Sequence, residues 1–308
     1  MKFIHKPVLF RETIESLDVR PGGRYIDGTA GGGGHSRAIA ERLTTGKLLS
    51  IDEDPDAVRA ASECLKEFPC AAVCHSNFSS LKSVAEKYGM IPADGVLFDL
   101  GVSSYQFDNP ERGFSYRADA PLDMRMSREG VSARDLVNTL SERELSDIIF
   151  RYGEEKFARS IAREIVRARE KAPVNTTLEL AGIIKKAIPA AARRGPGHPA
   201  RRTFQALRIA VNGELDRLSE GLDAAFSVLG PGGRLAVITF QSLEDRIVKK
   251  RMAGWASGII PTPEDPKHAF RKEPEGKLLY KRGLTPSREE IEDNPRCRSA
   301  RLRVLIKL

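Results

Sequence analysis

This sequence contains little cysteine and no long apolar run. Four cysteines among 308 residues are too few for the disulfide framework of a small secreted protein. No apolar run approaches the ~18 residues that a membrane-spanning helix needs. The opening residues MKFIH are followed by Pro7 and charged residues, not by the apolar core of a signal peptide. We therefore expect a soluble protein of the reducing cytoplasm with no membrane partner.

Acidic residues are in the minority. Lysine and arginine total 50, and aspartate and glutamate total 42, which gives a formal net charge of +8 and a pI near 9.3. The surplus is uneven, since residues 193–208 contain five arginines and no carboxylate. This balance favours a polyanionic partner such as nucleic acid without identifying it, because many basic faces are merely solvated.

The first hundred residues alternate short apolar runs with amphipathic segments. This pattern is typical of successive βα units and a mostly parallel sheet. Predicted strands cover Arg24–Asp27, Lys47–Asp52, Ala71–Ser76 and Gly95–Leu100, and predicted helices cover His35–Thr44, Pro55–Phe68 and Ser79–Tyr88.

Helix signals replace strand signals after about residue 108. Ser141 and Thr176 each stand three residues before a glutamate, which is the spacing of a capping box. Predicted helices cover Ala133–Leu140, Glu142–Tyr152, Lys156–Arg169 and Leu178–Ile188, and a basic Gly/Pro-rich loop follows at 193–199.

Strand signals return in the last third of the chain. Predicted elements are a long helix over Phe204–Leu229, a turn at 230–233, a strand over Arg234–Phe240, a helix over Ser242–Met252, and strands over Lys277–Tyr280 and Leu302–Lys307. The economical interpretation is an α/β fold in which residues 1–108 and 204–308 form one doubly wound domain. Residues 109–203 are then a helical insertion domain.

The most informative local feature is the segment DGTAGGGGHS at 27–36, between the first strand and its helix. Glycines there let the backbone approach a bound group closely. Asp52 ends the second strand, where a carboxylate can accept hydrogen bonds from ribose hydroxyls. This order predicts a cofactor that contains a nucleoside, and the alternative is a purely structural turn.

Spacing alone does not identify the cofactor. Asp27 places a carboxylate at the start of the glycine loop, beside the expected ligand. An anion there disfavours the pyrophosphate of a dinucleotide and suits the cationic sulfonium of S-adenosylmethionine. We therefore expect S-adenosylmethionine, and titration with it and with NAD would separate the two.

The next two strand ends carry further candidates. Phe78 follows the third strand, where it either lies against an adenine ring or fills the core, and the sequence leaves both open. Asp99 closes the fourth strand and leads into DLGVSSYQ at 99–106. Ligands of open parallel sheets bind at the carboxyl ends of the strands, so we expect Asp99, Ser103 and Ser104 to orient the acceptor.

Motifs spread over nearly the whole chain resemble those of a known family. They are HKPVL at 5–9, the glycine loop, DLGVSS at 99–104, RGFSYRADAPLDMRM at 112–126, HPARRTFQALRIAVNGEL at 198–215, SLEDRIVK at 242–249 and NPRCRSARLRV at 294–304. The sequence is similar to the S-adenosylmethionine-dependent N(4)-cytosine methyltransferases of small-subunit (16S) ribosomal RNA, the MraW or RsmH family.

The resemblance implies a class I, Rossmann-like methyltransferase fold and methylation of the exocyclic amine of a cytidine in the decoding centre of 16S rRNA. It also suggests a homodimer. Gln241 stands where the family usually has histidine, and we interpret it as a positioning residue. The expected cofactor contacts are Gly33, Gly34, His35, Asp52, Phe78, Asp99 and Gln106, to which the loop argument adds Asp27 and Gly31.

The expected chemistry is direct transfer to an amine. A hydrogen-bond acceptor near the amine and in-line placement of the methyl group would supply most of the acceleration, with no metal and no covalent intermediate. Methylation of carbon 5 would need a cysteine nucleophile, and the four cysteines lie outside the expected loops. The spacing of Cys70, Cys74 and His75 lacks the second ligand pair of a zinc site.

Arginines of the insertion are the expected contacts to RNA, with a domain hinge or a solvated helix end as the alternative. The residues are Arg112, Arg117, Arg125, Arg194, Arg201 and Arg202. A paired base cannot reach the cofactor, so the target must be unstacked. Two other classes stay open: a small-molecule methyltransferase, against which the basic segments argue, and a non-catalytic RNA-binding assembly factor.

Overall fold

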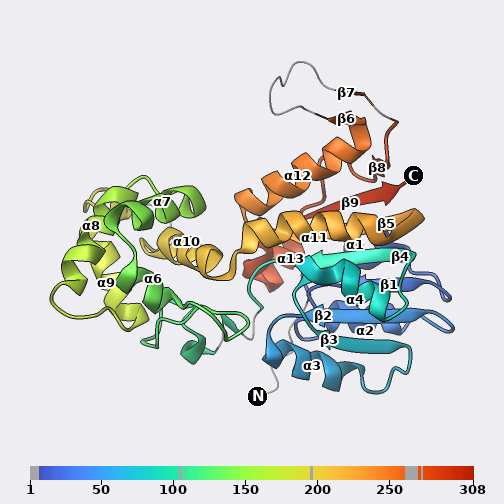
Figure 1. Ribbon diagram of the computed structural model, residues 1–308, viewed down its shortest axis with the longest axis horizontal. Coiled ribbons are helices and arrows are strands. Elements are labelled where there is room, and N and C mark those ends of the chain that lie inside the picture. The colour runs from blue at the N-terminus through green and yellow to red at the C-terminus, as the bar shows by residue number, and fades with distance from the viewer. Residues whose placement is uncertain (1–6, 104–105, 108, 195–196, 261–269, 272) are drawn as a thin grey trace. The chain divides into compact units, whose positions relative to one another are not determined.

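The computed structural model describes residues 7–103, 106–107, 109–194, 197–260, 270–271 and 273–308 (Figure 1). The chain divides into two compact units, one formed by Met1–Gly101 with Leu215–Leu308 and the other by Val102–Glu214. The expected boundaries, at residues 108 and 204, differ from these. The second differs because the helix predicted over Phe204–Leu229 is two helices, α10 (Arg201–Asn212) and α11 (Glu214–Val228), separated by Gly213 with φ 59°.

Seven strands form the sheet of the first unit within the described residues. Their order is β3 (Ala71–His75), β2 (Lys47–Asp52), β1 (Arg24–Asp27), β4 (Ala93–Asp99), β5 (Leu229–Thr239), β9 (Arg301–Lys307) and β8 (Gly276–Leu278). Strands β1 to β5 are parallel, whereas β9 runs antiparallel to both β5 and β8. The expected α/β fold with a mostly parallel sheet is confirmed.

The order of the strands in the sheet indicates where a ligand would bind. Successive strands run outward on one side from β1 to β3 and on the other side from β4 to β5, so the order reverses between β1 and β4. Open α/β sheets bind ligands at such a switch point, outside the carboxyl ends of the strands. Asp27 and Asp99 end the two strands that flank it.

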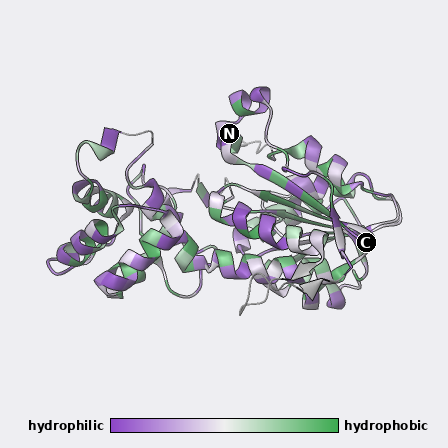
Figure 2. Cartoon of the chain, turned by 90° about the horizontal axis from the view of Figure 1, so that it is seen from above, coloured by the Kyte–Doolittle hydropathy of each residue, from purple (hydrophilic) through white to green (hydrophobic). Residues whose placement is uncertain are grey.

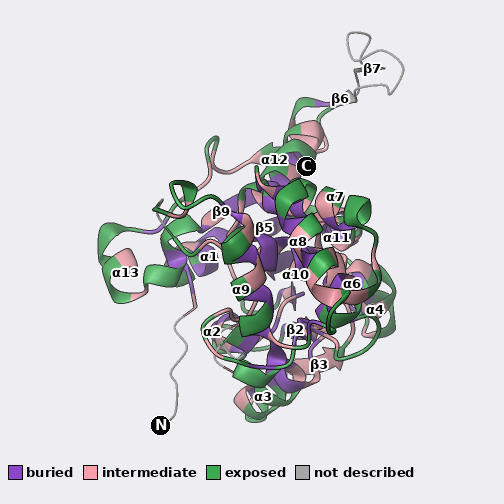
Figure 3. Cartoon of the chain, turned by 90° about the vertical axis from the view of Figure 1, so that its left-hand side faces the viewer, coloured by how far each residue is buried: buried purple, intermediate pink, exposed green. Residues whose placement is uncertain are grey.

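Helices cover both faces of this sheet. They are α1 (Phe10–Leu17), α2 (Gly34–Ala40), α3 (Pro55–Leu65), α4 (Leu81–Lys87), α11, α12 (Ser242–Ser257) and α13 (Arg288–Asp293). Val96 and Phe98 of β4 pack into one apolar cluster, while Leu97 between them packs into another. Successive side chains of a strand point to opposite faces, which explains why β4 is apolar from Val96 to Phe98 without alternation. Figure 3 shows β5 buried as well.

Three features of the first unit differ from the prediction. Helices α1 and α13 were not predicted, and β5 begins at Leu229, so the expected turn at 230–233 lies inside the strand. The pairing of β5 with β4 shifts register between Ala93 and Gly95, which accommodates the glycines.

The second unit contains α6 (Ala133–Thr139), α7 (Glu142–Gly153), α8 (Ala158–Arg169), α9 (Thr177–Ala187) and α10. The capping boxes predicted at Ser141 and Thr176 are present, and Ser132 forms a third with Asp135. Each helix has apolar and polar sides (Figure 2), and the apolar sides share one core that includes Leu145, Ile161 and Phe204. In the described part of the chain, no helix combines the length and the apolarity needed to cross a membrane.

Candidate functional site

The glycine loop connects β1 to α2 and is tied to β2. Gly33 caps α2 with φ 82°, and a Cβ there would lie 2.9 Å from the Cβ of Cys64. At Gly34 a Cβ would lie 2.5 Å from Pro7, so both positions require glycine. The Gly31 N–H donates to Oδ2 of Asp52 over 2.8 Å, while a Cβ at Gly32 would meet nothing within 4 Å. The loop is therefore anchored at its ends and open at Gly32.

Asp27 lies inside the protein. Its side chain is 1% exposed, Ser36 Oγ donates to its Oδ2 over 2.6 Å, and the Thr29 N–H donates to its Oδ1 over 3.1 Å. Burial raises the pKa of this carboxyl, against the opposing effects of the Ser36 hydrogen bond and the nearby His35. Its oxygens accept hydrogen bonds within the turn from β1 into α2, and the expected contact of Asp27 with the ligand stays a prediction.

Asp52 occupies the position expected for a ribose contact at the end of β2. It is half-buried, and its two oxygens accept backbone N–H groups of Asp54 and Gly31 over 2.9 and 2.8 Å. Burial raises its pKa to about 7, although those two hydrogen bonds favour the ionised form. The group therefore titrates near neutral pH.

Asp99, whose side chain is 20% exposed, and the buried His35 form a polar pair at the switch point. Asp99 Oδ2 lies 3.5 Å from His35 Nδ1, and the Asp99 N–H donates to Thr29 Oγ1 over 2.6 Å. The His35 side chain is 5% exposed and stacks on Phe10 with ring centroids 5.8 Å apart. Among the described residues, Asp99 Oδ1 and His35 Nε2 have no hydrogen-bond partner although both atoms are buried. An unpaired buried polar atom costs about 1–3 kcal/mol, so these two atoms suit a ligand.

Phe78 belongs to the core. Its ring lies 5.1 Å from the ring of Phe98 at 41°, and a Cβ on Gly221 of α11 would lie 2.4 Å from it. The ring is partly buried and packs against the core, and its expected contact with an adenine stays a prediction. The preceding Asn77 donates to Glu53 Oε2 over 2.8 Å, and Arg217 pairs with the same oxygen over 2.6 Å. The amide of Asn77 is the part of this group that the sequence indicates at the end of the third strand, whereas Glu53 and Arg217 were missed, and their only signal was the acidic run 52–54.

Gln241 caps α12 directly after β5. Its Nε2 donates to Glu244 Oε1 over 2.7 Å, and Glu244 Oε2 accepts the N–H groups of Phe240 and Gln241 over 2.9 and 3.2 Å. These bonds fix the amide, and they leave its Oε1 buried with no partner in the described structure. Gln241 therefore holds an acceptor in a set orientation at the carboxyl end of β5.

Ser103 and Gln106 belong to the second unit and bond to each other. The Ser103 N–H donates to Gln106 Oε1 over 3.0 Å, and the Gln106 N–H donates to Ser103 Oγ over 3.2 Å. Gln106 is 4% exposed. Its amide oxygen is thus used inside its own loop. Ser104 lies outside the described residues.

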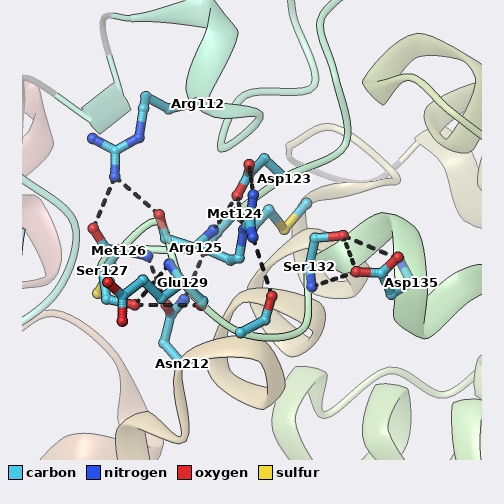
Figure 4. Close-up of polar contacts among 11 residues, drawn as sticks. Arg112, Asp123, Met124, Arg125, Met126, Ser127, Glu129, Ser132, Asp135 and Asn212 are labelled. Carbon is cyan, nitrogen blue, oxygen red and sulfur yellow. Dashed lines mark hydrogen bonds and ion pairs between the residues drawn. The ribbon is translucent and has the colours of Figure 1, made fainter.

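Two of the six expected RNA arginines are structural (Figure 4). Arg112 is 5% exposed, and its Nη2 donates to the carbonyl oxygens of Arg125 and Met126 over 2.9 and 3.0 Å. Arg125 binds both oxygens of Asp123 and the carbonyl of Gly130. Both guanidinium groups thus serve the irregular segment at 112–132, whose backbone carbonyls need donors, and the expected contacts of the two residues with RNA stay a prediction.

The other four arginines are exposed. Arg202 donates to the carbonyl of Glu154 over 3.2 Å. Arg117, Arg194 and Arg201 have no ion pair with any residue that the structure describes. Their guanidinium groups therefore remain available to an anion.

The glycine loop, the buried polar atoms at the switch point and the order of the sheet together define the class of protein, a class I methyltransferase fold carrying a helical unit. The chain belongs to the MraW methylase family, whose model matches residues 2–308.

Named relatives cover the whole chain. It is 52% identical to "Ribosomal RNA small subunit methyltransferase H" of Symbiobacterium thermophilum, over 100% of this chain and 98% of that one. It is 49% identical to the protein of that name from Brevibacillus brevis, over 100% and 99%. A solved rRNA methylase from Streptococcus thermophilus aligns over 99% of both chains at 11% identity with a TM-score of 0.46, too low to support an argument.

Proposed function

We propose that this protein transfers a methyl group from S-adenosylmethionine to the exocyclic N(4) amine of a cytidine in 16S ribosomal RNA. The family and its relatives, which are named for the RNA of the small ribosomal subunit, support the substrate class. The structural observation that carries the proposal is the buried, unpaired Oδ1 of Asp99 at the switch point of the sheet. It is an acceptor placed where a ligand that donates a hydrogen bond would satisfy it.

The residues of the first unit fit this cofactor. Asp52 offers a half-buried carboxylate to ribose hydroxyls, the open loop at Gly32 admits a close approach, and the unpaired Nε2 of His35 lies beside the same strand ends. Gly31, Gly33 and Gly34 shape that loop. When bound, S-adenosylmethionine supplies an electrophilic methyl group on a sulfonium.

The chain's own residues then prepare the amine. A cytosine amine is a poor nucleophile because its lone pair is delocalised into the ring. Asp99 accepts a hydrogen bond from the amine, which favours the localised lone pair and stabilises the charge that develops during transfer. His35, held by Phe10 and by α2, orients the Asp99 carboxylate. Ser103 and Ser104 orient the acceptor nucleotide within the same proposal.

RNA binding is assigned to the exposed arginines of the helical unit, Arg117, Arg194, Arg201 and Arg202. Phosphate contacts of this kind position a substrate without reading its sequence. The target base must leave its stack to react. We further propose a cytoplasmic protein that acts as a homodimer, and light scattering of the purified chain tests the dimer.

The decisive experiment is transfer of radiolabelled methyl to small subunits, and to naked 16S rRNA, from cells lacking the gene. We expect label in N(4)-methylcytidine after digestion to nucleosides. Label in another nucleoside would correct the target. If neither substrate is labelled but the RNA is bound, the non-catalytic assembly factor would replace the enzyme, and transfer to small amines alone would favour a small-molecule methyltransferase.

A further inference from the structure

A hollow of about 620 Å³ lies on the helical unit and is not used by the chemistry described above. It is lined by Tyr116, Arg117, Gly197, His198 and Arg201. The rings of His198 and Tyr116 stack with centroids 4.5 Å apart and planes 10° apart. Tyr116 in turn meets Phe204 edge-on at 5.5 Å and 86°, and Phe204 is 3% exposed. The hollow therefore contains an aromatic stack that is anchored in the core of the unit.

The orientation of His198 is fixed although the residue is exposed. The Ala200 N–H donates to its Nδ1 over 3.2 Å. Partial burial of the ring and the charges of Lys185 and Arg117 lower its pKa, which favours the uncharged imidazole. A neutral, oriented imidazole on a tyrosine is a surface on which a flat aromatic ligand can stack.

The charged residues that line this hollow in the described part of the chain are both positive. Arg117 and Arg201 line the hollow, and Lys185 lies close enough to influence His198. All three side chains are exposed, and none has an ion pair with another described residue. Cations with no internal partner beside an aromatic stack match the two parts of a nucleotide, its phosphate and its base.

A second hollow on the same unit shows that this combination is not a general property of the surface. It has the same volume, about 620 Å³, and is lined by Glu142, Arg143, Ser146, Asp147 and Arg159. Two carboxylates offset its two arginines, and it has no aromatic lining. It therefore provides a matched control.

We propose that the first hollow is a binding site for one unpaired nucleotide of the RNA substrate. The base stacks on the Tyr116–His198 pair, and Arg117 and Arg201 hold its phosphates. Every base has a π-face, so such a site tolerates any sequence and serves to hold single-stranded RNA. The assignment rests on the proposed function, because it takes RNA as the substrate.

The test measures binding and not catalysis. A fluorescent single-stranded RNA of about 10 nucleotides is titrated with the full chain, and a second RNA carries a fluorescent adenine analogue that is quenched on stacking. His198→Ala and Tyr116→Leu should each weaken binding about fivefold or more and remove the quenching. Arg117→Ala with Arg201→Ala should lower the slope of log affinity against log salt by about 1.4.

Arg143→Ala with Arg159→Ala removes the same charge from the control hollow and should leave the quenching intact. Circular dichroism and melting check that each variant is folded, and His198→Ala is the primary variant because its side chain is exposed. Wild-type affinity and quenching in His198→Ala would overturn the proposal. So would an acidic peptide that binds with the same dependence on His198 while RNA is not quenched, since the hollow would then take a protein.

The outcomes also separate this site from the methylation itself. A wild-type protein that binds and quenches RNA but labels no cytidine would refute the proposed function and leave the nucleotide site standing. Normal methyl transfer by the wild type, together with unchanged RNA affinity in His198→Ala, would support the proposed function and refute the nucleotide site.

Discussion

Replacing Asp52 with asparagine removes a carboxylate that burial at the end of β2 shifts from a pKa of 3.8 to about 7. In the unfolded chain this group ionises near its ordinary value, so at intermediate pH the folded chain binds more protons than the unfolded chain does. The contribution of this group to the free energy of unfolding should then fall as pH rises from about 4 to about 7, by at most ~1.4 kcal/mol per pH unit and ~4 kcal/mol in all.

Asp52→Asn lacks this titration. Its amide oxygen can accept only one of the two backbone hydrogen bonds that the carboxylate accepts from Asp54 and Gly31, which costs about 1 kcal/mol at every pH. Relative to the wild type, the variant should therefore gain stability as pH rises through this window and level off above it. Urea unfolding of both proteins at several pH values measures the difference. Asp18→Asn, which removes a carboxylate that is 59% exposed, controls for the loss of one charge.

The affinity for S-adenosylmethionine should depend on the ionisation of the same carboxyl group, but it should rise with pH where the stability falls. Ribose hydroxyls donate hydrogen bonds, so they favour the ionised Asp52 and lower its pKa when bound. S-adenosylmethionine should bind about tenfold more weakly at pH 6 than at pH 8 in the wild type, whereas the affinity of Asp52→Asn should be low and flat. Calorimetric titration measures both. Parallel pH profiles in the two proteins would refute the assignment of the ribose to Asp52.

Three further substitutions test the remaining assignments. Asp99→Ala should abolish methyl transfer while leaving the melting temperature nearly unchanged, and a variant that retains turnover would remove Asp99 from the chemistry. Arg112→Ala leaves the carbonyl oxygens of Arg125 and Met126 without their donor and should destabilise the chain by about 2–4 kcal/mol in urea unfolding, against less than about 0.5 kcal/mol for Arg117→Ala. Gln241→Leu removes a buried acceptor and should lower kcat roughly ten- to a hundredfold, whereas Gln241→His should restore most of it; equal rates would show that the amide only caps α12.

The sheet could be predicted because each strand carries its own signal. The bounds predicted for β1 and β2 match the structure, since both are short apolar runs ending in an aspartate. The glycine loop was found for the same reason, as it follows β1 directly. Helix α1 gave no such signal, because its caps Leu9 and Asp18 both adopt a left-handed conformation and neither residue is a usual N-cap or C-cap.

Tertiary context decided what the sequence could not. The periodicity of 204–229 is continuous, yet Gly213 breaks it, and the buried residues of α10 pack with those of α7 and α8 in the helical core. Phe78 was ambiguous because an aromatic residue after β3 suits both an adenine and a core, and Gly221 on α11 is what opens space for the ring. That glycine lies far away in the sequence.

The arginines show how composition overstates a binding surface. Arg112, Arg117 and Arg125 share one basic aromatic segment, but the fold uses the guanidinium groups of the first and third to bond backbone carbonyls and Asp123. A guanidinium group that is buried or held by an internal carboxylate is less able to replace the counterions of RNA phosphates than an exposed one with N–H groups left over. Since each phosphate contact to a single strand contributes about 0.7 to the salt slope, Arg112→Ala should leave that slope unchanged wherever the chain stays folded, while Arg117→Ala lowers it. The charge that matters to RNA is thus the part that the fold leaves unpaired, and Arg117 and Arg201 beside the Tyr116–His198 stack belong to it.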